Sequence, residues 1–393
     1  TRRGAAMLLL ADHHPDIFAF IEAKRTPGVL EGANISVAIS DAFMDAVRMG
    51  ADWDLHWGGE VFRTVPAASL WNQITASAWA SGEPGVVFLE RMNKESNASY
   101  CEEIVATNPC AEQPLGANAV CLLGSVNVLE HVDQGVLDIT KLRATVAVAV
   151  RFLDNIIDLA YYPFIECEVS EKGLRRMGLG TIGLADALIA CGLRYGSEDA
   201  VRFTALVFKT IRDAAYEASI ELARERGPFP WYQETEYLHS PFILSLEGKT
   251  QLGIQTHGIR NAFLTSQAPT GTIAKLAGVW AGIEPYYDKK TIIKNRLGEH
   301  NVLAPDSEYL VTADEVSPEE HVEMMVAAQS YIDSAVSKTV NAPKSQTAAE
   351  TKKVYQLAYA RGLKSLAYYR DGSRDVQVQY KGSDCVIGEG VCA

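Results

Sequence analysis

The segment ATNPCAEQPLGANAVC, residues 106–121, carries four side chains that could do chemistry: Asn108, Cys110, Glu112 and Cys121. The first three stand at alternate positions, and alternate side chains of an extended chain point to the same face. We therefore expect an amide, a thiol and a carboxylate side by side. A free cysteine is easily buried as a small hydrophobe, but a buried carboxylate is unfavourable unless it is paired or has a function. The pattern thus indicates a reactive site.

Two common uses of a reactive cysteine do not fit this segment. A cysteine–histidine hydrolase needs a partner histidine, and none of the eight histidines is marked out by its neighbours. A zinc site needs Cys-x-x-Cys or histidine-rich spacing; neither occurs, so we predict no metal site. Radical chemistry remains. A thiyl radical at Cys110 could take a hydrogen atom from a sugar carbon, while Glu112 accepts a proton from the neighbouring hydroxyl and Asn108 binds a second hydroxyl.

A glycine-rich stretch, GLGTIG at residues 178–183, fits the dinucleotide-binding fingerprint. That fingerprint has value only between a strand and a helix. The preceding SEKGLRRM is polar, and no acidic residue ends a second strand at the expected distance. We interpret these glycines as serving close helix packing or a turn. A nicotinamide-dependent dehydrogenase using residues 178–183 remains a weaker alternative.

A second small-residue stretch, APTGTIAKLAG at 268–278, precedes a predicted helix. Hydroxyls and free backbone N–H groups at such a place can bind an anion. The alternative is an ordinary strand-to-helix turn capped by Thr270 or Thr272. It is not a Walker loop, because no Gly-Lys-Ser/Thr follows. The residues alone leave both interpretations open.

Composition excludes several classes of protein. The net charge is −13 and no Lys/Arg run exceeds two residues, so a nucleic-acid groove is not expected. No apolar run approaches the roughly 20 residues that span a bilayer. The seven cysteines are an odd number scattered over a long chain, which does not suit a secreted disulfide framework. We predict a cytoplasmic protein with no membrane or nucleic-acid partner.

Short strands alternate with helices over the whole chain. Apolar or β-branched runs predict strands at 5–11, 36–41, 85–90 and 365–369, the first two of them buried. Helical periodicity predicts helices at 16–25, 41–49, 66–80, 139–160, 184–192, 198–226, 317–340 and 345–361. The helix at 139–160 is apolar all round, so we expect it to be largely buried. This order indicates one α/β domain with a mostly parallel sheet or barrel.

Taken together, these residues resemble the large catalytic subunit of ribonucleotide reductase. NPCAEQPL is similar to that family's Asn-x-Cys-x-Glu finger loop. Further similar stretches follow in the same order along the chain: TRRGAAMLLLADHHPDIFAFIEAK, NISVAISDAFM, RRMGLGTIGLADALIACGLRYGSEDA, GIRNAFLTSQAPTGTIAKLAG, GIEP and YYRDGSR.

The resemblance implies reduction of ribonucleoside di- or triphosphates to 2′-deoxyribonucleotides. It implies that Cys110 is the thiyl residue that takes the 3′-hydrogen, that Glu112 deprotonates the 3′-hydroxyl and that Asn108 binds the ribose hydroxyls. Cys121 matches one of the family's two reducing thiols. The loop that binds the substrate phosphates is implied to be Ala268, Pro269, Thr270, Gly271, Thr272 and Ile273. The resemblance also assigns GLGTIG to the reductase fold.

The radical source is implied to be adenosylcobalamin, because the motifs look most like the class II enzymes. The alternative is a diiron centre and tyrosyl radical from a small subunit. It is kept open by Tyr368 and Tyr369, which stand where the iron-dependent class has its radical-transfer tyrosines. An ordinary strand with one aromatic on each face would also explain this pair.

For the fold, the resemblance implies a ten-stranded α/β barrel, incomplete here at its N-terminal side. We expect residues 1–370 to form the catalytic domain and 371–393 a flexible tail. In that tail Cys385 and Cys392 are candidates for re-reducing the site by thiol exchange. Thr1, Arg2 and Arg3 resemble the end of the specificity loop. Cys101, Cys167 and Cys191 are interpreted as structural.

The resemblance also implies partners. We expect dNTP or ATP effectors, bound through an N-terminal part missing here that would also hold the second reducing thiol. We further expect a thioredoxin-type reductant and a homodimer when the protein is complete. A non-catalytic fragment that needs such an N-terminal segment is the remaining alternative.

Overall fold

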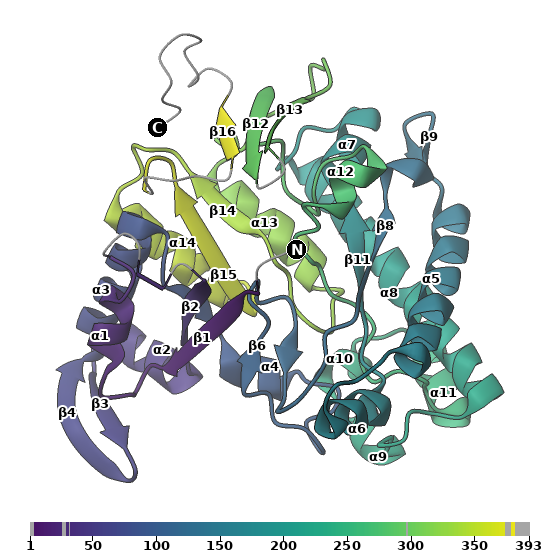
Figure 1. The fold of residues 1–393 in the computed structure, drawn as a ribbon, viewed down its shortest axis with the longest axis horizontal. Helices are drawn as coiled ribbons and strands as arrows, with labels where there is room; N and C mark the ends of the chain where they lie inside the picture. Colours follow the sequence, from purple (N-terminus) through teal and green to yellow (C-terminus); the bar gives the residue numbers. More distant parts are fainter. Residues whose placement is uncertain (1–3, 26–28, 31, 296–297, 374–378, 382–393) are drawn as a thin grey trace.

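The computed structural model describes residues 4–25, 29–30, 32–295, 298–373 and 379–381. Its largest sheet has the strand order β1 (Ala6–Ala11), β2 (Ala33–Ala38), β5 (Gly85–Val87), β15 (Ser365–Arg370) and β14 (Thr339–Ala342) (Figure 1). The first three strands are parallel to one another and the last two are parallel to each other. The two groups meet antiparallel at β5 and β15. Thr1, Arg2, Arg3, Cys385 and Cys392 lie outside the described residues.

A second parallel pair, β8 (Leu123–Asn127) and β11 (Gly178–Ile182), forms a two-stranded sheet of its own. Single parallel bridges join Leu179 to Thr265 and Gln267 to Val336, just before β14. The strands therefore form one series from β8 through β11, residues 265–267, β14, β15, β5 and β2 to β1. An α/β fold is confirmed. The ten-stranded barrel is not, since the strands of the described residues do not close into a ring.

The other strands form small ribbons: β3 (Asp52–Trp57) with β4 (Glu60–Pro66), β6 (Ala106–Thr107) with β7 (Pro114–Leu115), β9 (Val132–Asp133) with β10 (Val136–Leu137), and β12 (Lys290–Asn295) with β13 (Gly298–Leu303) and β16 (Gln379–Lys381). In Figure 1, β6 lies between β1 and β11. The ribbon of β6 and β7 is the one that carries Cys110.

The helices pack against this wall of strands. The helices α3 and α14 contact β15, α13 contacts β14, and α5 contacts β8. No helix among the described residues has the length and apolarity needed to cross a membrane. The bounds are α1 (Ile17–Glu22), α2 (Asp41–Met49), α3 (Ala67–Ser81), α4 (Leu89–Lys94), α5 (Ile139–Leu159), α6 (Ile165–Leu174), α7 (Leu184–Ala190), α8 (Glu198–Arg226), α9 (Glu234–Leu238), α10 (Pro241–Leu244), α11 (Gly248–His257), α12 (Ile273–Ala277), α13 (Pro318–Gln329) and α14 (Ala348–Ala360), with a 3₁₀ turn at Leu129–His131.

Helices with local start signals were predicted well. The predicted helix at 198–226 is α8, which begins where Ser197 accepts a hydrogen bond from the N–H of Ala200. The predicted helices at 41–49 and 66–80 are confirmed as α2 and α3. Ser40 caps α2 in the same way by accepting from Phe43. Capping by a serine hydroxyl satisfies a backbone donor at the helix start and depends only on neighbouring residues.

Three predictions about the fold were wrong because they depended on distant neighbours. α5 buries only one face, since its outer face meets no other layer: Val148, Phe152 and Leu159 are 70%, 61% and 84% exposed. The predicted helix at 317–340 ends at Gln329. The chain then turns at Asp333, which accepts the N–H groups of Leu264 and Thr265, and enters β14. β1 is partly exposed, not buried, because it is the edge strand.

The GLGTIG stretch forms β11, whose residues are all buried. A Cβ atom on Gly180 would lie 2.3 Å from the carbonyl oxygen of Ser266, and one on Gly178 would lie 2.2 Å from Nε2 of Gln113. Gly178 and Gly180 therefore allow close approach of a neighbouring segment and not of a helix. The predicted turn is found at Gly183, which precedes α7 in the left-handed conformation with a φ of 71°. In the dinucleotide fingerprint they follow the strand, whereas here Gly178 and Gly180 lie within it. The stretch gives no support to a nicotinamide site.

We expect Gly180→Ala to lower the free energy of unfolding by about 3 kcal/mol, because the new methyl group collides with backbone that cannot move aside cheaply. Urea denaturation followed by circular dichroism measures this. Gly248→Ala is the matched control, since nothing lies within 4 Å of a Cβ there, and it should cause no loss. Equal stability of the two variants would contradict the close approach.

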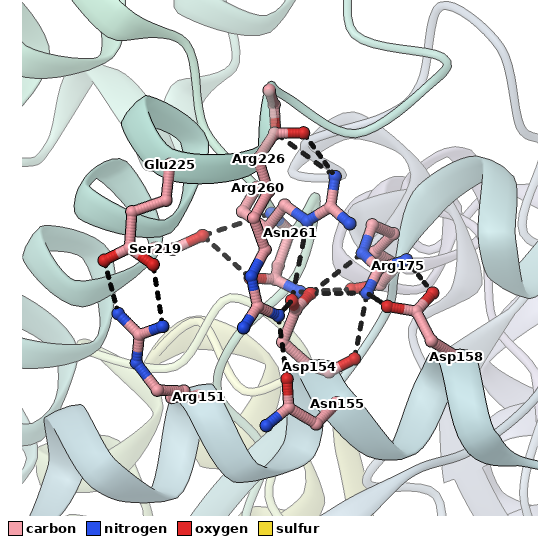
Figure 2. A network of polar contacts seen from close by, with 11 residues as sticks. Arg151, Asp154, Asn155, Asp158, Arg175, Ser219, Glu225, Arg226, Arg260 and Asn261 are labelled. Atoms are coloured by element: carbon pink, nitrogen blue, oxygen red, sulfur yellow. Dashed lines mark hydrogen bonds and ion pairs between the residues drawn. The ribbon is translucent and has the colours of Figure 1, made fainter.

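A buried ionic network anchors the segment that leads into β11 (Figure 2). Asp154 of α5 is fully buried, and its carboxylate accepts hydrogen bonds from Arg175, Arg226, Arg260 and Asn261. Arg175 also holds Asp158 with distances of 2.7 and 3.0 Å. Arg175 ends α6 in the left-handed conformation, with φ of 49°. The network thus fixes the turn between α6 and β11.

Asp154→Asn should lower the free energy of unfolding by about 3–5 kcal/mol, because breaking a buried ion pair leaves uncompensated buried charge. The change is measured by urea denaturation. Glu225→Gln is the control, since Glu225 makes a comparable bidentate pair with Arg151 on the exposed surface, and it should change little. A similar small effect for both variants would show that the network is not structurally important.

Candidate active site

Asn108, Cys110 and Glu112 lie at the tip of a tight hairpin between β6 and β7. Across the tip, the N–H of Asn108 donates to Gln113 O at 3.2 Å, and the N–H of Ala111 donates to Asn108 O at 3.0 Å. Ala111 has a φ of 65°. The expected extended segment is therefore wrong. Asn108 and Glu112 approach each other because the chain turns back, not because strand residues alternate.

Residues from β2 and from the segments at 266 and 335 hold the tip of the hairpin by hydrogen bonds. Asn34 of β2 donates to the carbonyl oxygen of Pro109 at 2.6 Å. The carbonyl oxygen of Glu112 accepts from the Ser266 hydroxyl at 2.8 Å and from the N–H of Ala335 at 2.9 Å. Gln113 packs beside Gly178 of β11. The hairpin thus lies between β2 and β11, and strands on either side position Cys110.

The carboxyl group of Glu112 is buried, with the residue only 2% exposed. Burial raises its pKa, and a hydrogen bond from the Asn108 side chain opposes this shift. Oδ1 of Asn108 already accepts a hydrogen bond from the N–H of Gln113 at 3.0 Å. The NH₂ group of Asn108 is therefore the part that can donate a hydrogen bond to Glu112. Oε2 of Glu112 has no hydrogen-bond partner among the described residues. A buried carboxyl group with a raised pKa and an unpartnered oxygen is a candidate for proton transfer.

The two thiols of the segment differ in environment. Cys110 is exposed and lines a cavity, whereas Cys121 is partly buried, and neither forms a disulfide with another described cysteine. Burial is the main cause that raises the pKa of Cys121 to about 12, and the negative charges of Glu112 and Cys110 add to it. Cys121 therefore lies within electrostatic reach of both. The structure brings the four sequence-predicted residues into one region.

The cavity beside Cys110 has a volume of about 520 Å³, which is in the range of small-ligand sites. It is lined by widely separated parts of the chain, among them Asn34, Cys110, Pro269, Gly271, Lys338 and Tyr369. Of the predicted phosphate loop, Pro269 and Gly271 face the cavity. Ala268 is buried, while Thr272 and Ile273 are exposed.

The loop at 268–273 is not an ordinary capped turn. Thr272 precedes α12 but its side chain caps no backbone group. Thr270 has a φ of 59°, and its hydroxyl accepts the N–H of Gly282 at 2.7 Å. The loop is thus tied to the 281–285 segment, which also lines the cavity.

A buried lysine in the cavity wall was missed by the sequence analysis. Nζ of Lys338 donates to Oε2 of Glu284 at 2.9 Å, to Nδ1 of His321 at 2.7 Å and to Thr339 O at 2.9 Å. Nε2 of His321 faces the carbonyl oxygen of Ala313 and must donate to it, which leaves Nδ1 as the acceptor. All three ammonium protons are used. No local spacing could have signalled this cluster, because its members come from three separate segments.

The tyrosine pair lies on β15, as expected from SLAYY, and both residues line the cavity. Tyr368 is 2% exposed, and its hydroxyl is 2.8 Å from Oγ1 of Thr351. Its ring packs near that of Tyr355 in the core. Packing in the core is therefore enough to explain a tyrosine at position 368.

The architecture defines an α/β protein in which a hairpin that carries a cysteine lies between two groups of strands. The family model described as "Ribonucleotide reductase, barrel domain" matches residues 1–310 and 301–369. The chain therefore belongs to the ribonucleotide reductase family, in its barrel domain, and the resemblance found in the sequence is confirmed.

Individual relatives agree with this assignment. A vitamin B12-dependent ribonucleoside-diphosphate reductase of Mycobacterium tuberculosis (strain CDC 1551 / Oshkosh) is 36% identical over 418 residues, covering 96% of this chain and 58% of the relative. One from Thermoplasma acidophilum is 32% identical, covering 97% and 53%. A ribonucleoside-diphosphate reductase large subunit of Variola virus is 32% identical, covering 77% and 45%. The chain spans about half the length of these relatives.

We expect Glu112→Gln to stabilise the folded chain by on the order of 1 kcal/mol at pH 8, because the unsatisfied buried carboxylate is removed. The pKa of Glu112 is higher in the folded than in the unfolded chain. Through this group the wild-type protein is therefore most stable at low pH, where the carboxyl group is protonated in both states, and it loses stability as the pH rises through the folded-state pKa. The advantage of the variant should therefore shrink at pH 4. Urea denaturation at both pH values measures it. The exposed Glu103→Gln is the control, and a pH-independent difference for Glu112→Gln would contradict the assignment.

Proposed function

We propose that the protein containing this chain reduces ribonucleoside di- or triphosphates to 2′-deoxyribonucleotides. The observation that carries the proposal is the hairpin that presents Cys110 to a cavity, with Asn108 and Glu112 at the same tip. The chain covers about half of its relatives, so the activity is proposed for the whole protein. The names of these relatives, ribonucleoside-diphosphate reductases, support the diphosphate as substrate.

The proposed chemistry uses each residue of the hairpin at a stated atom. Sγ of Cys110, as a thiyl radical, takes the hydrogen atom from C3′ of the ribose. Glu112 accepts the proton of the 3′-hydroxyl, which its raised pKa suits. Asn108 donates to the ribose hydroxyls. The loop Ala268–Ile273 places the phosphates through its backbone N–H groups, supported by the position of Gly271 in the cavity wall.

Adenosylcobalamin is the proposed radical source, as the names of the Mycobacterium tuberculosis and Thermoplasma acidophilum relatives suggest. The residues present fit such a group. Cys110 is exposed, and the cavity wall beside it includes Trp280, Tyr287 and Tyr369, which offer an apolar surface to a large cofactor that brings its own cobalt ligands. When bound, the cofactor supplies a carbon radical by homolysis. A diiron and tyrosyl-radical subunit acting through Tyr368 and Tyr369 is the alternative that the assay below separates.

The remaining assignments are proposals for the whole protein. Cys121 is one of two reducing thiols, and a thioredoxin-type dithiol restores them, through Cys385 and Cys392 if these form the tail pair. We propose residues 1–370 as the catalytic domain, with 371–393 as the tail. Thr1–Arg3 would transmit effector identity, dNTP or ATP, within a homodimer. The strand series would belong to a ten-stranded barrel.

Cys110→Ser should lower turnover by on the order of a thousandfold or more, since the chemistry depends on this one sulfur. The assay measures deoxycytidine products from CDP and CTP with the full protein. It is run with adenosylcobalamin and dithiothreitol, then with a diiron small subunit in place of the cofactor. Cys101→Ser, which changes an exposed thiol outside the cavity, should retain activity.

Turnover of Cys110→Ser at the Cys101→Ser rate would rule out the radical role. Activity with the small subunit alone would assign the iron-dependent mechanism. Assaying this chain by itself and then the full protein tests whether the chain is a fragment that acts only with another segment.

A further inference from the structure

Cys121 lies near a buried arginine, not in an apolar environment. Strands β8 and β11 pair Leu123 with Gly178, and the N–H of Gly178 donates to Leu122 O at 2.8 Å. Cys121 and Arg176 stand two positions before these partners, just outside the two strands, and the charge of Arg176 acts on the Cys121 thiol. Arg176 is 1% exposed. Its guanidinium pairs with Glu102 and donates to Pro114 O at 3.0 Å, so two of its five N–H donors have these partners.

A second buried carboxyl group, Glu171, lies in the last turn of α6, just before Arg176. The residue is 2% exposed, and its Oε1 has no hydrogen-bond partner in the part of the chain that the structure describes. Burial raises its pKa to about 8; Arg176 and Arg175 oppose the shift and Glu102 adds to it. Glu171 therefore carries a proton at neutral pH and can release it. Neither the fold nor the hairpin chemistry uses this group.

Glu171 and Cys121 act on each other electrostatically. The charged and titratable groups that face Cys121 are Glu112, Glu171 and Cys110, which raise the pKa of its thiol, and Arg176, which lowers it. The groups that face Glu171 include Arg175, Arg176, Glu102 and, from the chain before α6, Tyr162. Two further buried groups, Oε2 of Glu112 and the side-chain amide of Gln113, also have no hydrogen-bond partner among the described residues. Such atoms are the ligands that a buried bridging water needs.

We propose that Glu171 is the internal acid that returns a proton to Cys121 when this sulfur leaves a disulfide. The inference rests on the proposed function, since only a redox role of Cys121 creates a disulfide there. An external dithiol attacks the sulfur bonded to Cys121, the S–S bond breaks, and the electron pair stays on Sγ of Cys121. The O–H bond of Glu171 then breaks as an S–H bond forms, directly or through a water. The dithiol supplies both electrons, and solvent reprotonates the carboxylate.

The coupling can be tested on the purified chain without any turnover. Iodoacetamide alkylates the thiolate of Cys121, and peptide mass spectrometry reads the rate at each cysteine. In Glu171→Gln no charge develops beside the thiol, so alkylation of Cys121 at pH 9 should be on the order of tenfold faster than in the wild type. Glu171→Asp keeps a carboxylate and should return toward the wild-type rate. Glu166→Gln, at an exposed position of the same helix, should match the wild type.

The unchanged chain gives a second test that requires no variant to fold. Because Glu171 ionises near pH 8, the logarithm of the Cys121 rate should rise by less than one per pH unit between pH 7 and 9, while that of Cys101 rises by one. A wild-type Cys121 rate in Glu171→Gln, or a slope of one at Cys121, overturns the proposal. Because neither readout involves the reductase assay, a failure here is distinguishable from a failure of the proposed function.

Discussion

The carbonyl oxygen of Glu112 is the atom on which the arrangement of the site depends. It accepts one hydrogen bond from the Ser266 hydroxyl and another from the N–H of Ala335, and so joins the hairpin to two strand segments far away in sequence. A buried carbonyl must find such donors or destabilise the fold. The segments at 265–267 and 335–336 therefore have to come close to the hairpin, and Gly178 and Gly180 leave the room for them to do so.

The same region holds groups that a purely structural core would avoid. Glu112, Gln113 and Glu171 each bury a polar atom without a hydrogen-bond partner among the described residues. A fold stabilised elsewhere can carry such groups where they serve a reaction. Here the Asp154 network supplies rigid support at the α6–β11 turn (Figure 2). That turn leads directly to Arg176 and from there to the strand beside Cys121.

How much could be predicted from the sequence depended on whether the cause was local. Ser40 and Ser197 mark helix starts because a cap is made within three residues. The types and spacing of residues 108–112 indicated the site, although a turn at Ala111 groups them and not an extended strand. Lys338 could not be found, since Glu284 and His321 reach it only through the tertiary fold. The burial of α5 was misjudged for the same reason: apolarity does not show which faces have neighbours.

The central claim is that Sγ of Cys110 takes the hydrogen atom from C3′ of a ribonucleotide. The most direct measurement compares turnover of CDP and of 3′-deuterated CDP by the full protein under identical conditions. The account predicts slower turnover of the deuterated substrate, with the label returned to C3′ of the product. Equal rates in single-turnover experiments, with the label lost completely to solvent as expected of simple proton exchange, would contradict it.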